Sequence, residues 1–238
     1  MSEGNFDFEQ AIKDAHLGQV NIVVAGKTGI GKSTLINAIF GEDLAETGAG
    51  SPCTQETIHE YQKENSFLHL FDTKGIESET TQSMLTDLTD CINEHKDTNP
   101  NKHIHIAWYC IRNGRYENFE IEFIKSLSKQ IPVIVVVTQA PKKNCDTLAK
   151  LKNEPGIVNV LAVKAIDDED FDPNEEKSKI HGLKELTEKT YNLLPDAAKK
   201  AFAAAQKVNY ELRKASIEKI IAVAAAAATA AGAAPIPF

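Results

Sequence analysis

Residues 19–34, QVNIVVAGKTGIGKST, decide the fold of this 238-residue chain. The first seven are a β-branched apolar run, which predicts a strand over 19–25. The run leads into a glycine-rich loop at 26–33, and residues 34–40 have the apolar spacing of an amphipathic helix. A strand, a glycine loop and a helix in this order are typical of a phosphate-binding loop, and 26–33 fits its eight-position pattern.

Each residue type in the loop has a chemical role. Glycines permit backbone angles and a close approach that a Cβ atom would block, so successive N–H groups can point at phosphate oxygens. Lys32 supplies positive charge to the β- and γ-phosphates, and the Ser33 hydroxyl can coordinate Mg²⁺. A glycine-rich turn that fits by chance is the alternative, and the flanking strand and helix argue against it. We expect nucleotide contacts from Lys27, Thr28, Gly29, Ile30, Gly31, Lys32, Ser33 and Thr34.

Strand and helix patterns alternate along the rest of the chain. Apolar runs predict strands at 57–63, 67–71, 103–111, 132–137 and 157–164, of which the first two form an antiparallel hairpin. Helical spacing predicts helices at 79–94, 117–129 and 183–194. With the strand at 19–25, these runs predict an α/β fold: a six-stranded, mostly parallel sheet with one antiparallel strand and helices on both faces.

A second candidate element, DTKG at 72–75, directly follows the predicted strand 67–71. A carboxylate at Asp72 can hold Mg²⁺ through water, and the Gly75 N–H can approach a γ-phosphate without side-chain obstruction. A plain turn is the alternative for these four residues.

The segment 46–57 lies between the two elements and has few apolar anchors. Such a segment can order around Mg²⁺ and a γ-phosphate and relax without them. Thr54 is our candidate for the hydroxyl that completes the metal shell, and Thr57 is the second choice. Solvent exposure or helix capping is the alternative for both threonines.

These residues resemble the translation-factor-related GTPases, a class of P-loop proteins. The pattern Gly-x-Thr-Gly-x-Gly-Lys-Ser-Thr is similar to that of septins, immunity-related GTPases and bacterial GTPases related to Era and HSR, and the stretches at 105–111 and 136–140 resemble the last group. The resemblance covers residues 18–194 and implies a Ras-like sheet, GTP and GDP as ligands, Mg²⁺ as cofactor and GTPase activity. It implies catalytic roles for Lys32, Thr54 and Gly75, and metal ligation by Ser33, Thr54 and Asp72.

The base-reading residues depart from that class, which uses Asn or Thr, then Lys, any residue, and an Asp that accepts from guanine N1 and N2. Residues 138–141 here are TQAP, and Pro141 cannot accept those hydrogen bonds. Asp146 lies further along the same loop. Residues 162–164, AVK, resemble the Ser-Ala-Lys loop in which a backbone N–H meets guanine O6, and a plain strand end is the alternative. Nucleotide contacts expected in this region come from Thr138, Gln139, Val163 and Lys164.

A second departure concerns hydrolysis. Ile76 stands where Ras-like enzymes use glutamine to orient the attacking water, and its side chain can neither donate nor accept. Gly29 stands where Era-like enzymes have the asparagine that recruits potassium, so no potassium activation is expected. We expect a Mg²⁺-dependent nucleotide switch that hydrolyses GTP slowly. A relaxed-specificity NTPase or ATPase, and a nucleotide-binding scaffold without useful hydrolysis, are the alternatives.

The net charge and the cysteines indicate which classes of partner and which cellular compartment to expect. The formal net charge is −8, so no broad cationic surface exists to follow a phosphate backbone, and no nucleic-acid partner is expected. The four cysteines are too scattered for a zinc knuckle, and no secretory leader precedes them. These features predict a cytoplasmic protein, with membrane association as a further option.

The chain is expected to have three parts: an N-terminal segment at 1–17, a P-loop GTPase domain at 18–195 and a helical, alanine-rich apolar extension at 196–238. The extension has an apolar stripe along 198–215, and residues 220–238 carry no charge. We expect it to mediate homodimer or membrane contact, with simple helix packing as the alternative. Its ending, AAPIPF, resembles the opening of a hydrophobic C-terminal region in some bacterial GTPases of this group, which implies that the protein continues beyond residue 238.

Overall fold

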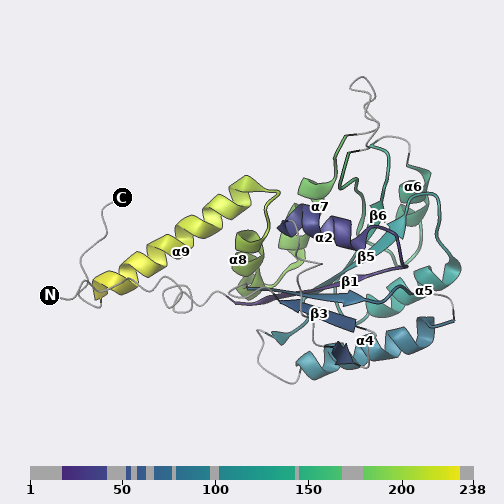
Figure 1. Cartoon of the computed structure of the whole chain (residues 1–238), viewed down its shortest axis with the longest axis horizontal. Coiled ribbons are helices and arrows are strands. Elements are labelled where there is room, and N and C mark those ends of the chain that lie inside the picture. The colour runs from purple at the N-terminus through teal and green to yellow at the C-terminus, as the bar shows by residue number, and fades with distance from the viewer. Residues whose placement is uncertain are drawn as a thin grey trace.

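A seven-stranded sheet runs through the described part of the chain, with β1 near its centre (Figure 1). The computed structural model describes residues 18–41, 52–54, 58–62, 67–76, 79–96, 102–142, 145–167 and 179–230. The strand order is β2-β3-β4-β1-β5-β6-β7. The strands are β1 (Val20–Ala25), β2 (Pro52–Thr54), β3 (Ile58–Gln62), β4 (Leu68–Thr73), β5 (Ile106–Arg112), β6 (Val133–Thr138) and β7 (Val160–Ala162).

The predicted sheet is confirmed for six strands, including the single antiparallel one. β3 runs antiparallel to β4, whereas the pairs β4–β1, β1–β5, β5–β6 and β6–β7 are all parallel. β2 is an addition that the sequence analysis did not predict. It is three residues long and pairs with β3 at one edge of the sheet, too short to give a recognisable apolar alternation.

Helices cover both faces of the sheet, as predicted. One apolar core lies between the sheet and helices α4 (Thr81–Lys96), α5 (Asn118–Leu127) and α6 (Asp146–Lys152). The other lies between the sheet and helices α2 (Lys32–Phe40), α7 (Leu183–Leu193) and α8 (Asp196–Ala205). Because both faces are covered, every residue of β1 is buried, which explains why all but one of them are apolar. The exception is Asn21, whose side chain donates to the His103 carbonyl at 2.8 Å.

Helix α8 packs in the core, which differs from the expected division of the chain at residue 196. Phe202 is fully buried, and its ring meets Phe40 edge-on at 6.1 Å between centroids. Phe40 in turn stacks on Trp108 of β5 at 5.9 Å. The alanines of α8 let the helix approach the sheet closely, so we propose that the composition change after residue 195 reflects tight packing. The division of the chain at residue 196 stays a prediction.

The apolar stripe expected along 198–215 is divided between two helices. The Gln206 side chain donates to the carbonyl oxygens of Ala203 and Asn209, and its amide oxygen accepts from the Asn209 N–H. These bonds satisfy the backbone at the break, and α9 (Tyr210–Ala230) begins just after it. Ser216 of α9 still donates to the Lys200 carbonyl of α8 at 3.0 Å.

Helix α9 projects away from the sheet (Figure 1). Ile217 and Ile221 are more than one-third exposed on it. Among the described residues, no helix combines the length and hydropathy that a membrane span requires.

Candidate functional site

The loop between β1 and α2 has the backbone that the glycine pattern predicts. Gly29 and Gly31 adopt positive φ angles of 74° and 95°, a region that other L-residues rarely occupy. Gly26 has a φ of 136°, and a Cβ atom there would collide with the carbonyl oxygen of Cys110 in β5. At Gly26, the backbone conformation and the lack of space for a Cβ atom therefore both require glycine. The loop ends at the N-terminus of α2, where free N–H groups favour the binding of an anion.

The ammonium group of Lys32 lies inside this loop. Its Nζ donates to the carbonyl oxygens of Gly26 at 3.2 Å and Lys27 at 3.3 Å. Ser33 follows in the first turn of α2 with its side chain exposed. Both residues therefore lie where a phosphate-binding lysine and a metal-binding hydroxyl are needed.

Asp72 lies beside the loop because β4 pairs with β1 in a register that places it opposite Val24. Its Oδ1 is buried without a hydrogen-bond partner among the described residues. Burial raises the pKa of Asp72 from 3.8 to about 6, although the charges of Lys32 and His59 act to lower it. A buried carboxylate oxygen that no described residue bonds, next to the loop lysine, fits the hard oxygen ligands that Mg²⁺ prefers.

Gly75 and Ile76 bring the DTKG element onto the phosphate loop. Gly75 lies so close to Thr28 that a Cβ atom would overlap the Thr28 hydroxyl. The Ile76 N–H donates to the Gly26 carbonyl at 3.3 Å, and the Ile76 side chain is fully buried in the core under α4 and α5. Ile76 is thus a packing residue, so no polar side chain occupies the position that orients water in Ras-like enzymes.

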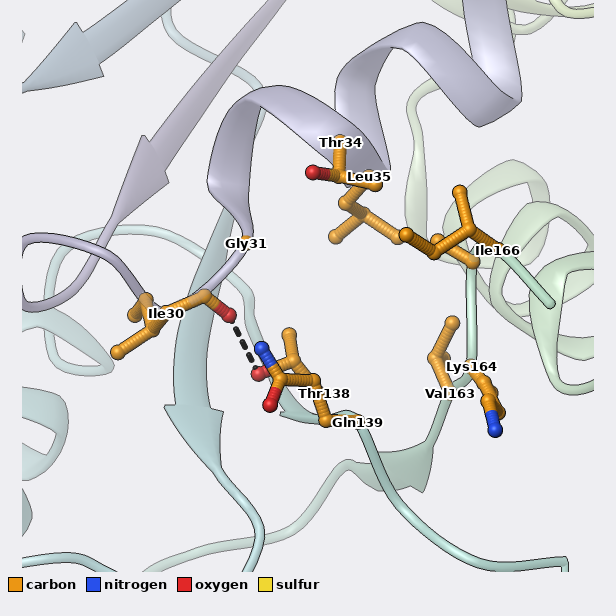
Figure 2. A pocket seen from close by; sticks show the side chains of 10 residues that line it. Ile30, Gly31, Thr34, Leu35, Thr138, Gln139, Val163, Lys164 and Ile166 are labelled. Carbon is orange, nitrogen blue, oxygen red and sulfur yellow. Dashed lines mark hydrogen bonds between the residues drawn. The ribbon is translucent and has the colours of Figure 1, made fainter. Parts of the chain in front are cut away.

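A cavity of about 350 Å³ opens next to the loop, between the start of α2 and the ends of β6 and β7 (Figure 2). Seven of the predicted nucleotide-contact residues line it. Thr138 also ties the two sides together, since its hydroxyl donates to the Ile30 carbonyl at 2.7 Å. Gln139 has a φ of 52°, which is strained for a side-chain-bearing residue and typical of functional sites. The full lining is Ile30, Gly31, Thr34, Leu35, Thr138, Gln139, Val163, Lys164, Ala165 and Ile166.

The backbone amides expected to read the base already donate within the protein. The Val163 N–H donates to the Val137 carbonyl at 2.8 Å, and the Lys164 N–H donates to the His181 carbonyl at 3.0 Å. This differs from the expectation that a backbone N–H here meets guanine O6. Neither Pro141 nor Asp146 is among the residues that line the cavity.

Lys27 was expected to contact nucleotide, but its ammonium group lies against α5. It pairs closely with Glu117, lies 3.5 Å from Glu120 Oε2 and sits 4.8 Å from the centre of the Phe119 ring. Desolvation acts to lower the pKa of Lys27, but the two carboxylates outweigh it and raise that pKa overall. The Glu117-x-x-Glu120 spacing signals a helix cap in the sequence, although nothing in the sequence identifies Lys27 as its partner.

The two threonines proposed as metal ligands cannot be placed from the described residues. The backbone of Thr54 belongs to β2, but the position of its side chain is not described, and Thr57 lies outside the described residues. The metal role of Thr54 therefore stays a prediction.

Comparison with known proteins matches residues 21–139 to the family described as 50S ribosome-binding GTPase. GTPase Era of Thermoanaerobacter sp. is 29% identical over 187 residues, which are 75% of this chain and 55% of Era. The tRNA modification GTPase MnmE of Blochmanniella pennsylvanica is 40% identical over 62 residues, 26% of this chain and 13% of MnmE. The chain therefore corresponds to about half or less of these two relatives.

The solved structures share the fold. The bacterial dynamin GTPase LeoA from ETEC superposes with a TM-score of 0.53 at 12% identity, covering 91% of this chain and 43% of LeoA. At that identity the likeness concerns the fold alone.

Proposed function

Because the chain belongs to the 50S ribosome-binding GTPase family, we propose that it is a Mg²⁺-dependent nucleotide switch that binds GTP and GDP and hydrolyses GTP slowly. The observation that carries the proposal is the position of Lys32, whose ammonium group lies inside the glycine loop next to Asp72, whose buried Oδ1 has no hydrogen-bond partner among the described residues. Cation and carboxylate together provide charge for phosphates and a ligand for their metal.

The roles of the individual residues follow from this arrangement. Lys32 neutralises the β- and γ-phosphates, and Ser33, Thr54 and Asp72 would hold Mg²⁺, which would offset the negative charge of the phosphates. Gly75, at the bend beside Thr28, offers its backbone N–H to the γ-phosphate. Hydrolysis is slow in this proposal because the buried Ile76 supplies no group to orient water.

Titration calorimetry with GTP and GDP, with and without Mg²⁺, tests the binding site. Lys32→Ala and Ser33→Ala should each weaken GTP binding on the order of tenfold to a hundredfold, because each removes a charge-assisted contact or a metal ligand. Lys150→Ala, a change on the exposed side of α6, is the control and should bind as the wild type does. Unchanged affinity in both loop variants, with the fold intact, would refute the site.

A comparison of the affinities for GTP and GDP tests whether the protein acts as a switch. Thr54→Ala should weaken GTP more than GDP, because the proposed contact depends on the γ-phosphate state. An equal loss for both nucleotides would place the switch threonine elsewhere. Single-turnover phosphate release then separates a slow GTPase from a scaffold, since a scaffold would retain GTP without releasing phosphate.

A second candidate, an NTPase with relaxed base specificity, is favoured by the lining of the cavity. Its ten lining residues include no carboxylate, and the amides of Val163 and Lys164 are already bonded. A paired acceptor is worth about 1–3 kcal/mol of discrimination, so its loss should bring GTP and ITP, which lacks the 2-amino group, to within about threefold. A strong preference for GTP that disappears in Asp146→Ala would instead identify Asp146 as the base acceptor.

Self-association or membrane contact through α9 is a further part of the proposal. The exposed Ile217 and Ile221 lie on the part of α9 beyond its last described bond to α8. Because α8 packs in the core, the informative truncation removes residues 217–238, which include both isoleucines, and leaves α8 intact. Sizing and liposome flotation should lose any assembly or membrane signal in this variant, while nucleotide affinity stays unchanged.

The cytoplasmic location is likewise a proposal. It is supported by Cys110 and Cys145, which are not in disulfides.

A further inference from the structure

Three consecutive residues of the phosphate loop contact three different parts of the fold. Gly26 packs on β5 and accepts from the Ile76 N–H, whereas Thr28 packs on Gly75. Lys27, between them, reaches across to the first turn of α5, 90 residues later in the chain. The position of the loop is therefore set from several sides at once.

The two lysines of the loop have divided roles. Lys32 directs its ammonium group onto the loop carbonyls, whereas Lys27 directs its own away, onto α5. The Lys27 side chain is only 17% exposed, and the Glu120 side chain only 2%. Lys27 is thus enclosed by helix α5 rather than extended over the phosphate-binding side of the loop.

The receptor for Lys27 is built by the cap of α5. Glu117 and Glu120 form a reciprocal capping box, in which the Glu117 N–H donates to Glu120 Oε2 at 2.9 Å. The same Glu120 oxygen lies 3.5 Å from the Lys27 ammonium group. Phe119, between the two glutamates, places its ring beneath that group. The helix cap therefore fixes the geometry of the site that receives the lysine.

The charges argue against a direct electrostatic role. Two carboxylates surround one ammonium group, so the cluster of Lys27, Glu117 and Glu120 is net negative if all three are ionised, beside a loop that must accept a polyanion. Lys27 cannot then act chiefly by attracting phosphate. Its remaining effect is to hold the loop against α5, so that the loop N–H groups are arranged before the nucleotide arrives.

We propose that Lys27 is a positioning residue, which anchors the phosphate loop to the capped first turn of α5 and thereby slows nucleotide release. The proposal rests on the proposed nucleotide-binding function. The loop N–H groups contact the phosphates that GTP and GDP share, so loss of the anchor should affect both nucleotides equally.

Stopped-flow release of fluorescent GDP and GTP analogues from the full chain tests this. Lys27→Met keeps the length and apolar stem and removes the charge. It should speed release of both nucleotides on the order of tenfold, because it leaves the buried Glu120 carboxylate without its cation, whereas Glu117 is about half exposed. Lys27→Arg should restore release to near the wild-type rate. Glu117→Gln should speed release too, and combining it with Lys27→Met should add little, because both changes remove the same interaction.

Lys125→Met is the matched control. It breaks the Lys125–Glu154 ion pair, 2.6 Å long and about one-third exposed, in which Lys125 belongs to the same helix α5. It should lower thermal stability by about as much as Lys27→Met and leave nucleotide release unchanged. A general effect of destabilising α5 would instead speed release in both variants and overturn the proposal.

Other outcomes also decide the question. A change of less than about twofold in Lys27→Met would show that the contact is only structural. A loss confined to GTP, or effects of Lys27→Met and Glu117→Gln that simply add, would show that Lys27 acts directly on phosphate. Failure of the wild-type chain to bind either nucleotide would overturn the proposed function itself, and with it this inference.

Discussion

Replacing Phe202 with alanine tests whether α8 belongs to the folded domain. The Phe202 side chain is fully buried, and its ring meets Phe40, which stacks on Trp108. Removing a buried phenylalanine ring costs about 3–5 kcal/mol, because apolar contact is lost and the cavity collapses only in part. A domain of this kind has a stability of about 5–15 kcal/mol, so Phe202→Ala should remove a large fraction of it.

Urea unfolding followed by tryptophan fluorescence measures this loss directly. Trp108 is the only tryptophan of the chain, is fully buried and lies next to Phe40. Ile221→Ala on the exposed part of α9 is the control and should cost less than about 0.5 kcal/mol. A loss below about 1 kcal/mol in Phe202→Ala, with an unchanged denaturant slope, would show that α8 is dispensable and would restore the division at residue 196.

Two further predictions concern titratable groups. Burial raises the pKa of Asp72 from 3.8 to about 6, so above pH 6 the charged carboxylate lowers the free energy of unfolding by about 3 kcal/mol. Asp72→Asn removes this cost, and it should stabilise the nucleotide-free protein at pH 7.5 and not at pH 4. The same variant should lose the Mg²⁺-dependent part of GTP binding in calorimetry, and unchanged Mg²⁺ dependence would remove Asp72 from the metal site. Desolvation lowers the pKa of His105 to about 4, so the unfolded chain binds the extra proton first and stability should fall as the pH drops from 6.5 to 4. In His105→Gln, the loss of unfolding free energy between pH 6.5 and pH 4 should be smaller by about 1–2 kcal/mol, a value reduced because solvent partly screens the ring. Urea unfolding at several pH values measures this loss, and an identical loss in both proteins would show that His105 does not cause it.

The sequence predicted the parts of the fold that have a regular apolar pattern. The long strands and the helices near 79–94, 117–129 and 183–194 were predicted within a few residues, because burial on one or both faces leaves a clear period. β2 and α6 were not predicted, since three and seven residues are too few to show one. Helix α8 was assigned to the extension because its apolar stripe continues to residue 215 and so predicted one long helix, whereas the turn at Gln206 that divides α8 from α9 leaves no clear sequence signal.

The phosphate-binding part of the site was predictable for a different reason. Gly26, Gly31 and Lys32 belong to one continuous motif, and the structure forms the expected loop around Lys32. The contact of Lys27 with α5 joins residues 90 positions apart, and no local pattern records such a pairing. Whether the Val163 amide is free likewise depends on the register of β7 against β6, which only the assembled sheet defines.

The place of α8 in the core affects the order in which the protein can fold during its synthesis. Phe40 is made early, but the aromatic cluster that it forms with Trp108 is completed only by Phe202. At about 5–20 residues per second, the 162 residues between Phe40 and Phe202 take roughly ten to thirty seconds to translate. During that interval the sheet face that α8 covers stays exposed on the nascent chain. The sheet face that carries α2 is therefore synthesised early but is fully covered only when the last helix of the core has emerged.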